Sequence, residues 1–278
     1  MTDKPIRFPL FLPADRMDRL EKAFASGADA VILDLEDGVA PAARTGARSA
    51  IRLACEPGAA AQPRAIPIWL RINAVGSDDH ASDLRLLSLA GLRGVVLPKA
   101  ETVQDLHAVR SAIGPDRVLI ALVETARGLA AARDLACACD QLAFGSIDYA
   151  ADLGLAHDRL ALLSARSELV LAARLARQHA PLDGVSVAIN DAALVEDDAR
   201  HGAMMGFGGK FIIHPAQIAP AKRGFAPTAT ELAWAHRILG MSESPQAVAV
   251  AGEMVDAPVL ARARAIVALA KEHKANLK

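Results

Sequence analysis

The stretch "VQDLHAVRSAIGPDRVLIALVET", Val103 to Thr125, contains one full unit of the pattern that decides the fold. In its first part, "VQDLHAVRSAIG", apolar residues recur at helical spacing. Its second part is a short apolar run, Val118 to Glu124, that ends in a carboxylate. Continuous apolar strands of this kind are buried on both faces, as in parallel sheets covered by helices. The stretch therefore predicts a helix that leads into a parallel strand.

The same alternation of short β-branched runs and longer alanine-rich helical runs occurs eight times along the chain. Eight such units predict an α/β fold, a (β/α)8 TIM barrel, because parallel strands need helical crossovers. An open doubly wound sheet is the weaker alternative, since no Gly-x-Gly-x-x-Gly follows the first strand. The predicted strands are Pro9–Pro13, Ala30–Glu36, Pro67–Asn73, Gly94–Lys99, Val118–Glu124, Gln141–Asp148, Gly184–Ile189 and Lys210–His214.

The residues after the eighth strand exceed what one closing helix requires. They contain "PTATELAWAHRILG", a break at "MSESPQ" and a long last helical run in which Pro258 fits the first turn. We therefore expect a barrel domain over residues 1–225 and a C-terminal helical extension or lid over residues 226–278. The break is interpreted as a hinge, and the extension is expected to be mobile and to pack on a neighbouring subunit.

Composition excludes several classes of function. The 278 residues are 53% hydrophobic, and 31 lysines and arginines nearly balance 32 aspartates and glutamates. No dense basic run is present, so no nucleic-acid partner is expected. No window approaches the length of a membrane helix, and the N-terminus has too short an apolar run for a signal peptide. The sequence indicates a soluble, cytoplasmic metabolic enzyme.

Ionisable and polar side chains gather where the predicted strands end. In parallel barrels the chemistry lies at the carboxyl ends of the strands, so side chains at six strand ends predict an active site. These residues are Asp34, Glu36 and Asp37 on strand two, Arg71 and Asn73 on strand three, Lys99 on strand four, Glu124 on strand five, Asp148 on strand six and His214 on strand eight.

Glu124 and Asp148 end adjacent strands, so their carboxylates can converge on one point. Two hard oxygen donors suit Mg2+, or Mn2+, better than zinc. The alternative is that each carboxylate pairs with a cation such as Arg71 on the same rim. The planar fork of Arg71 could equally clamp a substrate carboxylate or a developing oxyanion.

Eight motifs in the order "LFLPADRMDRLEKA", "DAVILDLEDGVAPAAR", "LRIN", "VVLPKAE", "ALVETARGL", "AFGSIDYAADLG", "GFGGKFIIHPAQI" and "EMVDAP" span nearly the whole chain. In this combination the sequence resembles the citrate lyase β-subunit-like proteins of the HpcH/HpaI aldolase/citrate lyase family, which include malyl-CoA and citramalyl-CoA lyases. The resemblance implies a Mg2+-dependent carbon–carbon lyase, in trimers or hexamers. The implied substrate is a β-hydroxyacyl thioester such as citryl-, malyl- or citramalyl-CoA, on CoA or on an acyl-carrier protein.

The resemblance also assigns roles to particular residues. It implies that Glu124 and Asp148 are metal ligands, with Glu124 close to substrate, and that Arg71 binds substrate. Asp256 of "MVDAP" matches a catalytic aspartate that related lyases deliver on the lid of an adjacent subunit. Arg16 and Lys22 match basic positions near the CoA phosphates. The family's usual glycine after the first proline is Ala14 here.

In the implied reaction, the carbon–carbon bond breaks to leave a keto acid and a thioester enolate. Arg71 would stabilise negative charge, and Asp256 would donate the proton that completes acetyl-CoA. Glu36 or a metal-bound water is the candidate base for the hydroxyl proton. On strand two, alternation places Asp34 and Glu36 on one face, where they are expected to orient metal-bound water and neighbouring basic side chains. The alternative is a purely structural ion pair.

Two other functions compete with the lyase. A class II aldolase of the HpcH/HpaI type would cleave free hydroxy-keto acids, but it would place a histidine base where Asp37 stands here. A non-catalytic ligand-binding subunit is the second alternative, because barrels host many functions. The joint presence of Arg71, Glu124, Asp148 and Asp256 favours an enzyme.

Overall fold

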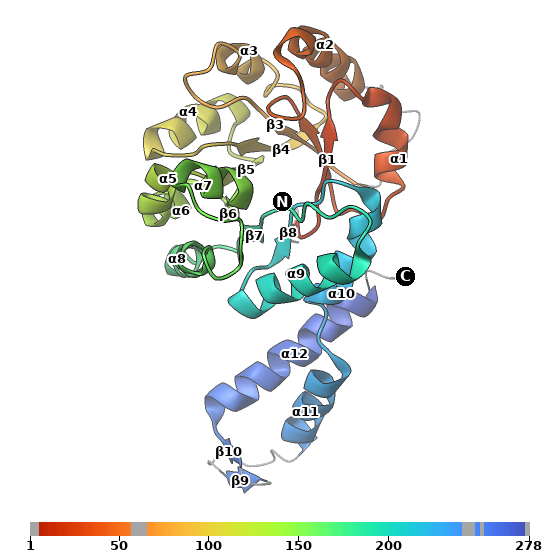
Figure 1. Ribbon diagram of the computed structural model, residues 1–278, viewed down its shortest axis with the longest axis vertical. Helices are drawn as coiled ribbons and strands as arrows, with labels where there is room; N and C mark the ends of the chain where they lie inside the picture. Colours follow the sequence, from red (N-terminus) through yellow and green to blue (C-terminus); the bar gives the residue numbers. More distant parts are fainter. Residues whose placement is uncertain (1–5, 57–65, 241–247, 251–252, 276–278) are drawn as a thin grey trace.

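The protein is described by a computed structural model over residues 6–56, 66–240, 248–250 and 253–275. Within this part of the chain, eight strands form one sheet in sequence order, and each pairs with its neighbour in parallel. The sheet closes on itself, since Leu10 bridges Ile212 and the Phe11 N–H donates to the Ile212 carbonyl at 2.8 Å. The predicted (β/α)8 barrel is therefore confirmed (Figure 1). Its strands are β1 Leu10–Pro13, β2 Val31–Asp34, β3 Ile68–Arg71, β4 Leu92–Leu97, β5 Val118–Val123, β6 Gln141–Phe144, β7 Leu182–Asp183 and β8 Gly209–Lys210.

Helices cover the outside of the barrel, and the helix predicted from Val103 shows how the sequence fixes them. The Thr102 hydroxyl accepts the Asp105 N–H at 3.1 Å and so caps the first turn, and Gly114, with φ 79°, ends the helix. The helices are α1 Leu20–Phe24, α2 Arg44–Cys55, α3 His80–Leu84, α4 Val103–Ile113, α5 Ala126–Ala130, α6 Ala132–Ala138, α7 Ser146–Leu153, α8 Leu163–Leu175, α9 Ala192–Met205, α10 Ile218–Phe225, α11 Ala229–Gly240 and α12 Ala257–Ala275.

Three predicted strands differ from the structure. β6 ends at Phe144 and α7 starts at Ser146, so Asp148 lies in the first turn of a helix and not on a strand. The predicted strand Gly184–Ile189 is wrong, because β7 ends at Asp183. The loop that follows is held by a side chain, since the Gln217 amide donates to the carbonyls of Ser186 at 2.7 Å and Ala188 at 3.0 Å.

The eighth strand is also displaced. β8 covers Gly209–Lys210, whereas the prediction began at Lys210 and ran to His214. Only glycine fits at position 209, because a β-carbon there would lie 1.9 Å from the Arg7 carbonyl oxygen. The His214 side chain accepts the Ala216 N–H at 3.2 Å and begins a short 3-10 helix, Pro215–Gln217. His214 thus caps the 3-10 helix and does not line the cavity.

The barrel has two apolar layers. Residues that point outward pack under the helices, whereas inward residues fill the barrel. The inward residues are Ala30, Ile32, Trp69, Val96, Ile120, Leu122, Ala143, Leu182 and Phe211. Because side chains alternate along a strand, the next inward positions toward the carboxyl ends of β2, β3 and β5 are Asp34, Arg71 and Glu124. The fold thus places three ionisable side chains at the mouth of the barrel, next to its apolar interior.

The C-terminal part of the chain forms an arm. α11 and α12 pack on one another around a small core of Ala235, Ile238, Val255 and Ala263. The arm extends away from the barrel, and the hairpin β9 Val248–Val250 with β10 Glu253–Val255 lies at its far end (Figure 1). Pro258 lies in the first turn of α12, as predicted. The predicted hinge, residues 241–246, lies outside the described residues.

No helix in the described ranges combines the length and the apolar character that crossing a bilayer requires.

Candidate active site

A cavity of about 360 Å3 opens at the carboxyl ends of the strands. One part of its wall is ionisable or polar: Asp34, Asp37, Arg71, Glu124, Ser146 and Asp148. The other part is apolar: Phe11, Leu122, Phe144, Val185, Phe211 and Ile213. The structure therefore brings together three residues of the predicted site, Arg71, Glu124 and Asp148, although they come from three different β/α units.

Arg71 is held by a buried carboxylate on the neighbouring strand. Asp34 and Arg71 are register partners, and Nε and one terminal nitrogen of the guanidinium each donate to Asp34 at 2.7 Å. Asp34 also accepts the N–H groups of Glu36 at 3.0 Å and Gly38 at 2.9 Å, so both its oxygens are committed. This bidentate geometry fixes the plane of the guanidinium, which lies 4.8 Å from the Phe11 ring centre.

Glu36 lies beside Arg71 and does not line the cavity. One of its oxygens is 3.0 Å from the Arg71 guanidinium, and the other accepts from Lys99 Nζ at 2.6 Å. Burial raises the pKa of Glu36, and the charge of Arg71 and the hydrogen bond from Lys99 offset only part of that rise. For Arg71, burial lowers the pKa, but the charge and hydrogen bonds of Asp34 together with the charges of Glu36 and Glu124 outweigh it, so the pKa lies above its ordinary value. Glu36 as a base stays a prediction.

Glu124 is the most buried acid of the cavity wall, with 2% of its surface exposed. One oxygen accepts the backbone N–H of Lys99 at 2.8 Å. The other lies against Gly145, where a β-carbon would come within 2.2 Å of it. Burial raises the pKa of Glu124 well above its ordinary value, and the negative charges of Glu36 and Asp148 raise it further.

The donor set of Glu124 and Asp148 fits a hard divalent cation. The charge of Asp148 adds to burial and to the charge of Glu36 in raising the pKa of Glu124, and a cation between the two carboxylates would remove their repulsion. Groups of three or more histidine, cysteine, aspartate and glutamate side chains that could hold a metal are absent from the described part of the chain. Two carboxylates leave most positions of an octahedral ion to substrate and water, which is how Mg2+ is commonly bound.

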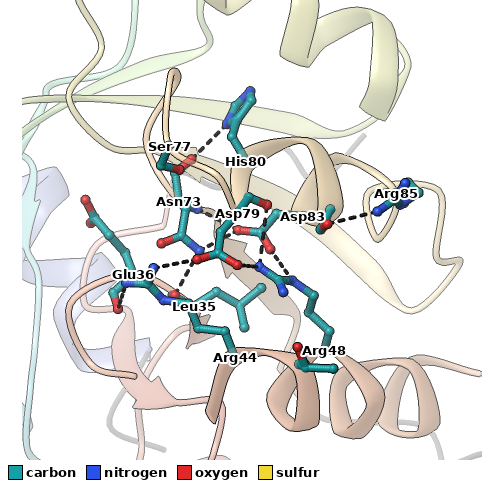
Figure 2. Close-up of polar contacts among 12 residues, drawn as sticks. Leu35, Glu36, Arg44, Arg48, Asn73, Ser77, Asp79, His80, Asp83 and Arg85 are labelled. Atoms are coloured by element: carbon teal, nitrogen blue, oxygen red, sulfur yellow. Dashed lines mark hydrogen bonds and ion pairs between the residues drawn. The ribbon is translucent and has the colours of Figure 1, made fainter. Parts of the chain in front are cut away.

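A second layer of charges holds the loops that carry the site (Figure 2). Asp83 is fully buried and accepts from the Asn73 backbone at 2.8 Å, from the Asn73 amide at 2.7 Å and from Arg48 Nε at 2.7 Å. The Asn73 amide also donates to the Leu35 carbonyl at 3.0 Å. Arg48 and Arg44 both pair with Asp79. This network joins the segment after β2 to the segment after β3, and so holds the two strand ends that carry Asp34 and Arg71.

Three predicted residues lie away from the cavity wall. The Arg16 side chain is 44% exposed and pairs with Asp18 at 3.3 Å, and Lys22 lies exposed on α1. Asp256 begins α12, where its carboxylate accepts the Val259 N–H at 3.1 Å. It follows β10 at the far end of the arm (Figure 1). The structure does not bring these residues to Arg71 within one chain.

One polar residue of the site, Ser146, was not singled out from the sequence, and Lys99 was placed at the site without a role. Ser146 lines the cavity and its hydroxyl is 3.0 Å from His157 Nε2. Lys99 was noted only as a strand end, whereas it contacts both Glu36 and Glu124. The motif "VVLPKAE" places Lys99 at the barrel mouth, but its contacts with Glu36 and Glu124 have no local sequence signal because both partners are distant in the chain.

Comparison with known proteins agrees with this geometry. The chain is 39% identical over 273 residues to a citrate lyase subunit beta-like protein of Mycobacterium tuberculosis, a match that covers 95% of each protein. It is 33% identical to a (3S)-malyl-CoA thioesterase of Cereibacter sphaeroides, over 87% of this chain and 85% of that protein.

Among solved structures, CitE from Mycobacterium tuberculosis in complex with magnesium, acetoacetate and coenzyme A is similar, with a TM-score of 0.83 at 38% identity. That match covers 95% of this chain and 98% of the other. Residues 7–215 also match the family model described as HpcH/HpaI aldolase/citrate lyase. The chain therefore belongs to the HpcH/HpaI aldolase/citrate lyase family.

Proposed function

We propose that the protein is a Mg2+-dependent carbon–carbon lyase of the oxo-acid-lyase type. It would cleave a β-hydroxyacyl thioester such as citryl-, malyl- or citramalyl-CoA into acetyl-CoA, or an acetyl thioester, and a keto acid. It could also catalyse the reverse condensation. The observation that carries the proposal is that Arg71, Glu124 and Asp148 line one cavity at the mouth of the barrel. The magnesium and coenzyme A bound by the CitE relative support it. The cytoplasm is the location we expect.

Glu124 and Asp148 would hold the metal, with Mn2+ as a substitute. When bound, the metal supplies Lewis-acid polarisation of the substrate's hydroxyl and carboxylate oxygens. Arg71 lines the cavity while Asp34 fixes its plane, so its positive charge would stabilise the negative charge of the thioester enolate. Glu36 is held between Arg71 and Lys99, and it remains our candidate for receiving the hydroxyl proton.

Asp256 is the proposed proton donor to the enolate, and it would act from a neighbouring subunit. The arm extends away from its own barrel (Figure 1), and Asp256 follows β10 at its far end. This supports our proposal of a homo-oligomer, a trimer or hexamer, in which each arm would cover another chain's cavity. Arg16 and Lys22 are proposed to meet the phosphates of CoA. In this arrangement residues 226–278 form the lid and residues 1–225 the catalytic barrel.

Co-expression of Asp256→Asn and Arg71→Met chains tests the lid. Each variant alone is expected to be inactive, whereas mixed oligomers should recover activity at about a third of the sites of a trimer or about a quarter of those of a hexamer, the frequency at which an intact Arg71 meets a neighbour's intact Asp256. Activity is measured on oligomers purified through two different affinity tags. Mixed oligomers that stay as inactive as the parents would place Asp256 within its own chain's site or outside the chemistry.

A thioester panel tests the reaction and the acyl group. Arg71 is the only cation of the cavity wall among the described residues, and the opposite wall is apolar. A substrate with one free carboxylate and a small apolar substituent therefore fits better than citryl-CoA, which has two free carboxylates. We expect malyl- or citramalyl-CoA to give acetyl-CoA and a keto acid at a kcat/KM at least about tenfold above citryl-CoA, by chromatography of the products.

The same panel separates the competing functions. Turnover of free hydroxy-keto acids and of no thioester would favour the aldolase, although Asp37, not a histidine, lies 3.9 Å from the Arg71 guanidinium. Release of malate and free CoA would indicate a thioesterase, the activity named for the Cereibacter relative. No turnover in any arm would leave a non-catalytic ligand-binding subunit.

A further inference from the structure

Lys99 has a backbone conformation that a lysine rarely adopts. It directly follows Pro98 after β4, and its φ is 47°. In the described part of the chain, Arg177 is the only other non-glycine residue with a positive φ. The left-handed region brings the β-carbon close to the backbone, so such residues persist where surrounding contacts require them, often at functional sites.

The conformation lets one residue contact two carboxylates. The Lys99 N–H donates to Glu124 at 2.8 Å, and its side-chain Nζ donates to Glu36 at 2.6 Å. The next N–H, of Ala100, returns to the Leu122 carbonyl at 3.2 Å, so the turn is anchored on β5. With the N–H fixed on Glu124, the φ of residue 99 determines where its side chain and the next residue lie. At 47° they reach Glu36 and β5, so a residue that resists positive φ must give up one of these contacts.

The two contacts act on the carboxylates differently. The N–H occupies one oxygen of Glu124 and leaves the second beside Gly145, on the cavity wall. The ammonium holds Glu36 against Arg71, whose guanidinium is 3.0 Å from the other Glu36 oxygen. Without the ammonium, Glu36 would be a buried acid with a single cation partner and close enough to Glu124 to repel it.

We propose that Lys99 is a positioning residue of this site: its backbone presents Glu124 to the metal, and its ammonium keeps Glu36 from becoming a third metal ligand. The proposal rests on the metal-dependent function proposed above. It assigns Lys99 no contact with substrate. The left-handed backbone of Lys99 is proposed to support metal affinity, whereas the charge of its side chain is proposed to support kcat.

Two matched variants separate these parts. Lys99→Met removes the ammonium from an unbranched side chain that tolerates a left-handed backbone as well as lysine does. Lys99→Val removes the same charge, but its β-branched side chain opposes positive φ. Mn2+ affinity is titrated by electron paramagnetic resonance on the full-length oligomer without substrate, and kcat and KM are then measured with the best thioester.

For Lys99→Met we expect the Mn2+ affinity to rise at least about threefold, because one positive charge is removed and Glu36 is released toward the metal. Its kcat should fall at least about tenfold with KM within about twofold. For Lys99→Val we expect Mn2+ to bind at least about tenfold more weakly than in Lys99→Met, since the Glu124 contact is lost. Lys99→Arg should restore kcat to within about threefold of the wild-type value.

Several results would overturn the proposal. Equal Mn2+ affinity in the Met and Val variants, with both folded by circular dichroism, would remove the backbone role. A wild-type kcat in Lys99→Met, or a raised KM at unchanged kcat, would remove the positioning role of the ammonium. If the wild-type protein turns over no thioester while the Mn2+ series behaves as expected, the proposed lyase function fails and the role of Lys99 in metal binding stands.

Discussion

Replacing Glu124 by glutamine, or Asp148 by asparagine, is expected to lower Mg2+-dependent turnover by at least about a thousandfold while the chain stays folded. Each change keeps the shape of the side chain and removes one of the two negative charges that face each other across the cavity. At position 124 the change should also leave the protein as stable or more stable. Burial already opposes the charged form there, as the raised pKa shows, so the neutral amide avoids that cost near neutral pH.

Matched controls lie next to both ligands. Glu101→Gln removes the charge of a carboxylate that lies after β4 but outside the cavity wall. That carboxylate accepts a hydrogen bond from the Thr125 hydroxyl at 2.9 Å. Asp152→Asn does the same one turn further along α7, where the carboxylate accepts the Ala126 N–H at 2.8 Å. Both controls should keep Mn2+ affinity and turnover within about threefold of the wild-type values. Wild-type rates in both Glu124→Gln and Asp148→Asn would contradict the metal site.

Replacing Arg71 by methionine is expected to damage both activity and stability. Asp34 and Glu36 are 3% and 4% exposed, and the guanidinium is the cation they share. Breaking a buried pair by removing one partner costs about 3 kcal/mol or more, because the other charge stays buried. Turnover should fall at least about a hundredfold through loss of enolate stabilisation. Urea unfolding and steady-state kinetics measure the two effects.

Two further variants test whether the loss of the buried ion pair causes the loss of stability in Arg71→Met. Arg71→Lys keeps the charge but lacks the planar fork that binds both Asp34 oxygens, so it should regain part of the stability and little of the activity. Asp34→Asn combined with Arg71→Met removes one of the stranded charges and should unfold at a higher urea concentration than Arg71→Met alone, with no gain in activity. A double variant no more stable than Arg71→Met would show that the charges of the pair do not determine stability.

The barrel could be predicted because its signal is repeated. Each unit such as Val103–Thr125 carries its own change from helical to continuous apolar spacing, and eight of them leave few other topologies. The convergence of Arg71, Glu124 and Asp148 followed from the same reasoning, since side chains at the carboxyl ends of parallel strands share one rim.

The short strands and the details of the site were harder to predict from the sequence. β7 and β8 have two residues each, and the apolar residues after them belong to loops held by Gln217 and by the His214 cap. Local periodicity cannot distinguish such loops from strands. Asp148 was placed on a strand because the turn at Gly145 has no clear sequence signal. The left-handed backbone of Lys99 depends on contacts with β2 and β5 that are distant in sequence.

Gly145 also limits how the substrate range of this protein can change. A β-carbon at that position would lie 2.2 Å from a Glu124 oxygen, so no side chain can be added there without displacing the proposed metal ligand. Substitution at Gly145, directly after β6, is therefore closed as a route to new acyl groups. Val185 and Ile213 line the same cavity on segments that hold no metal ligand in our proposal. Diversification, in a laboratory library or among relatives, should thus concentrate at these two positions.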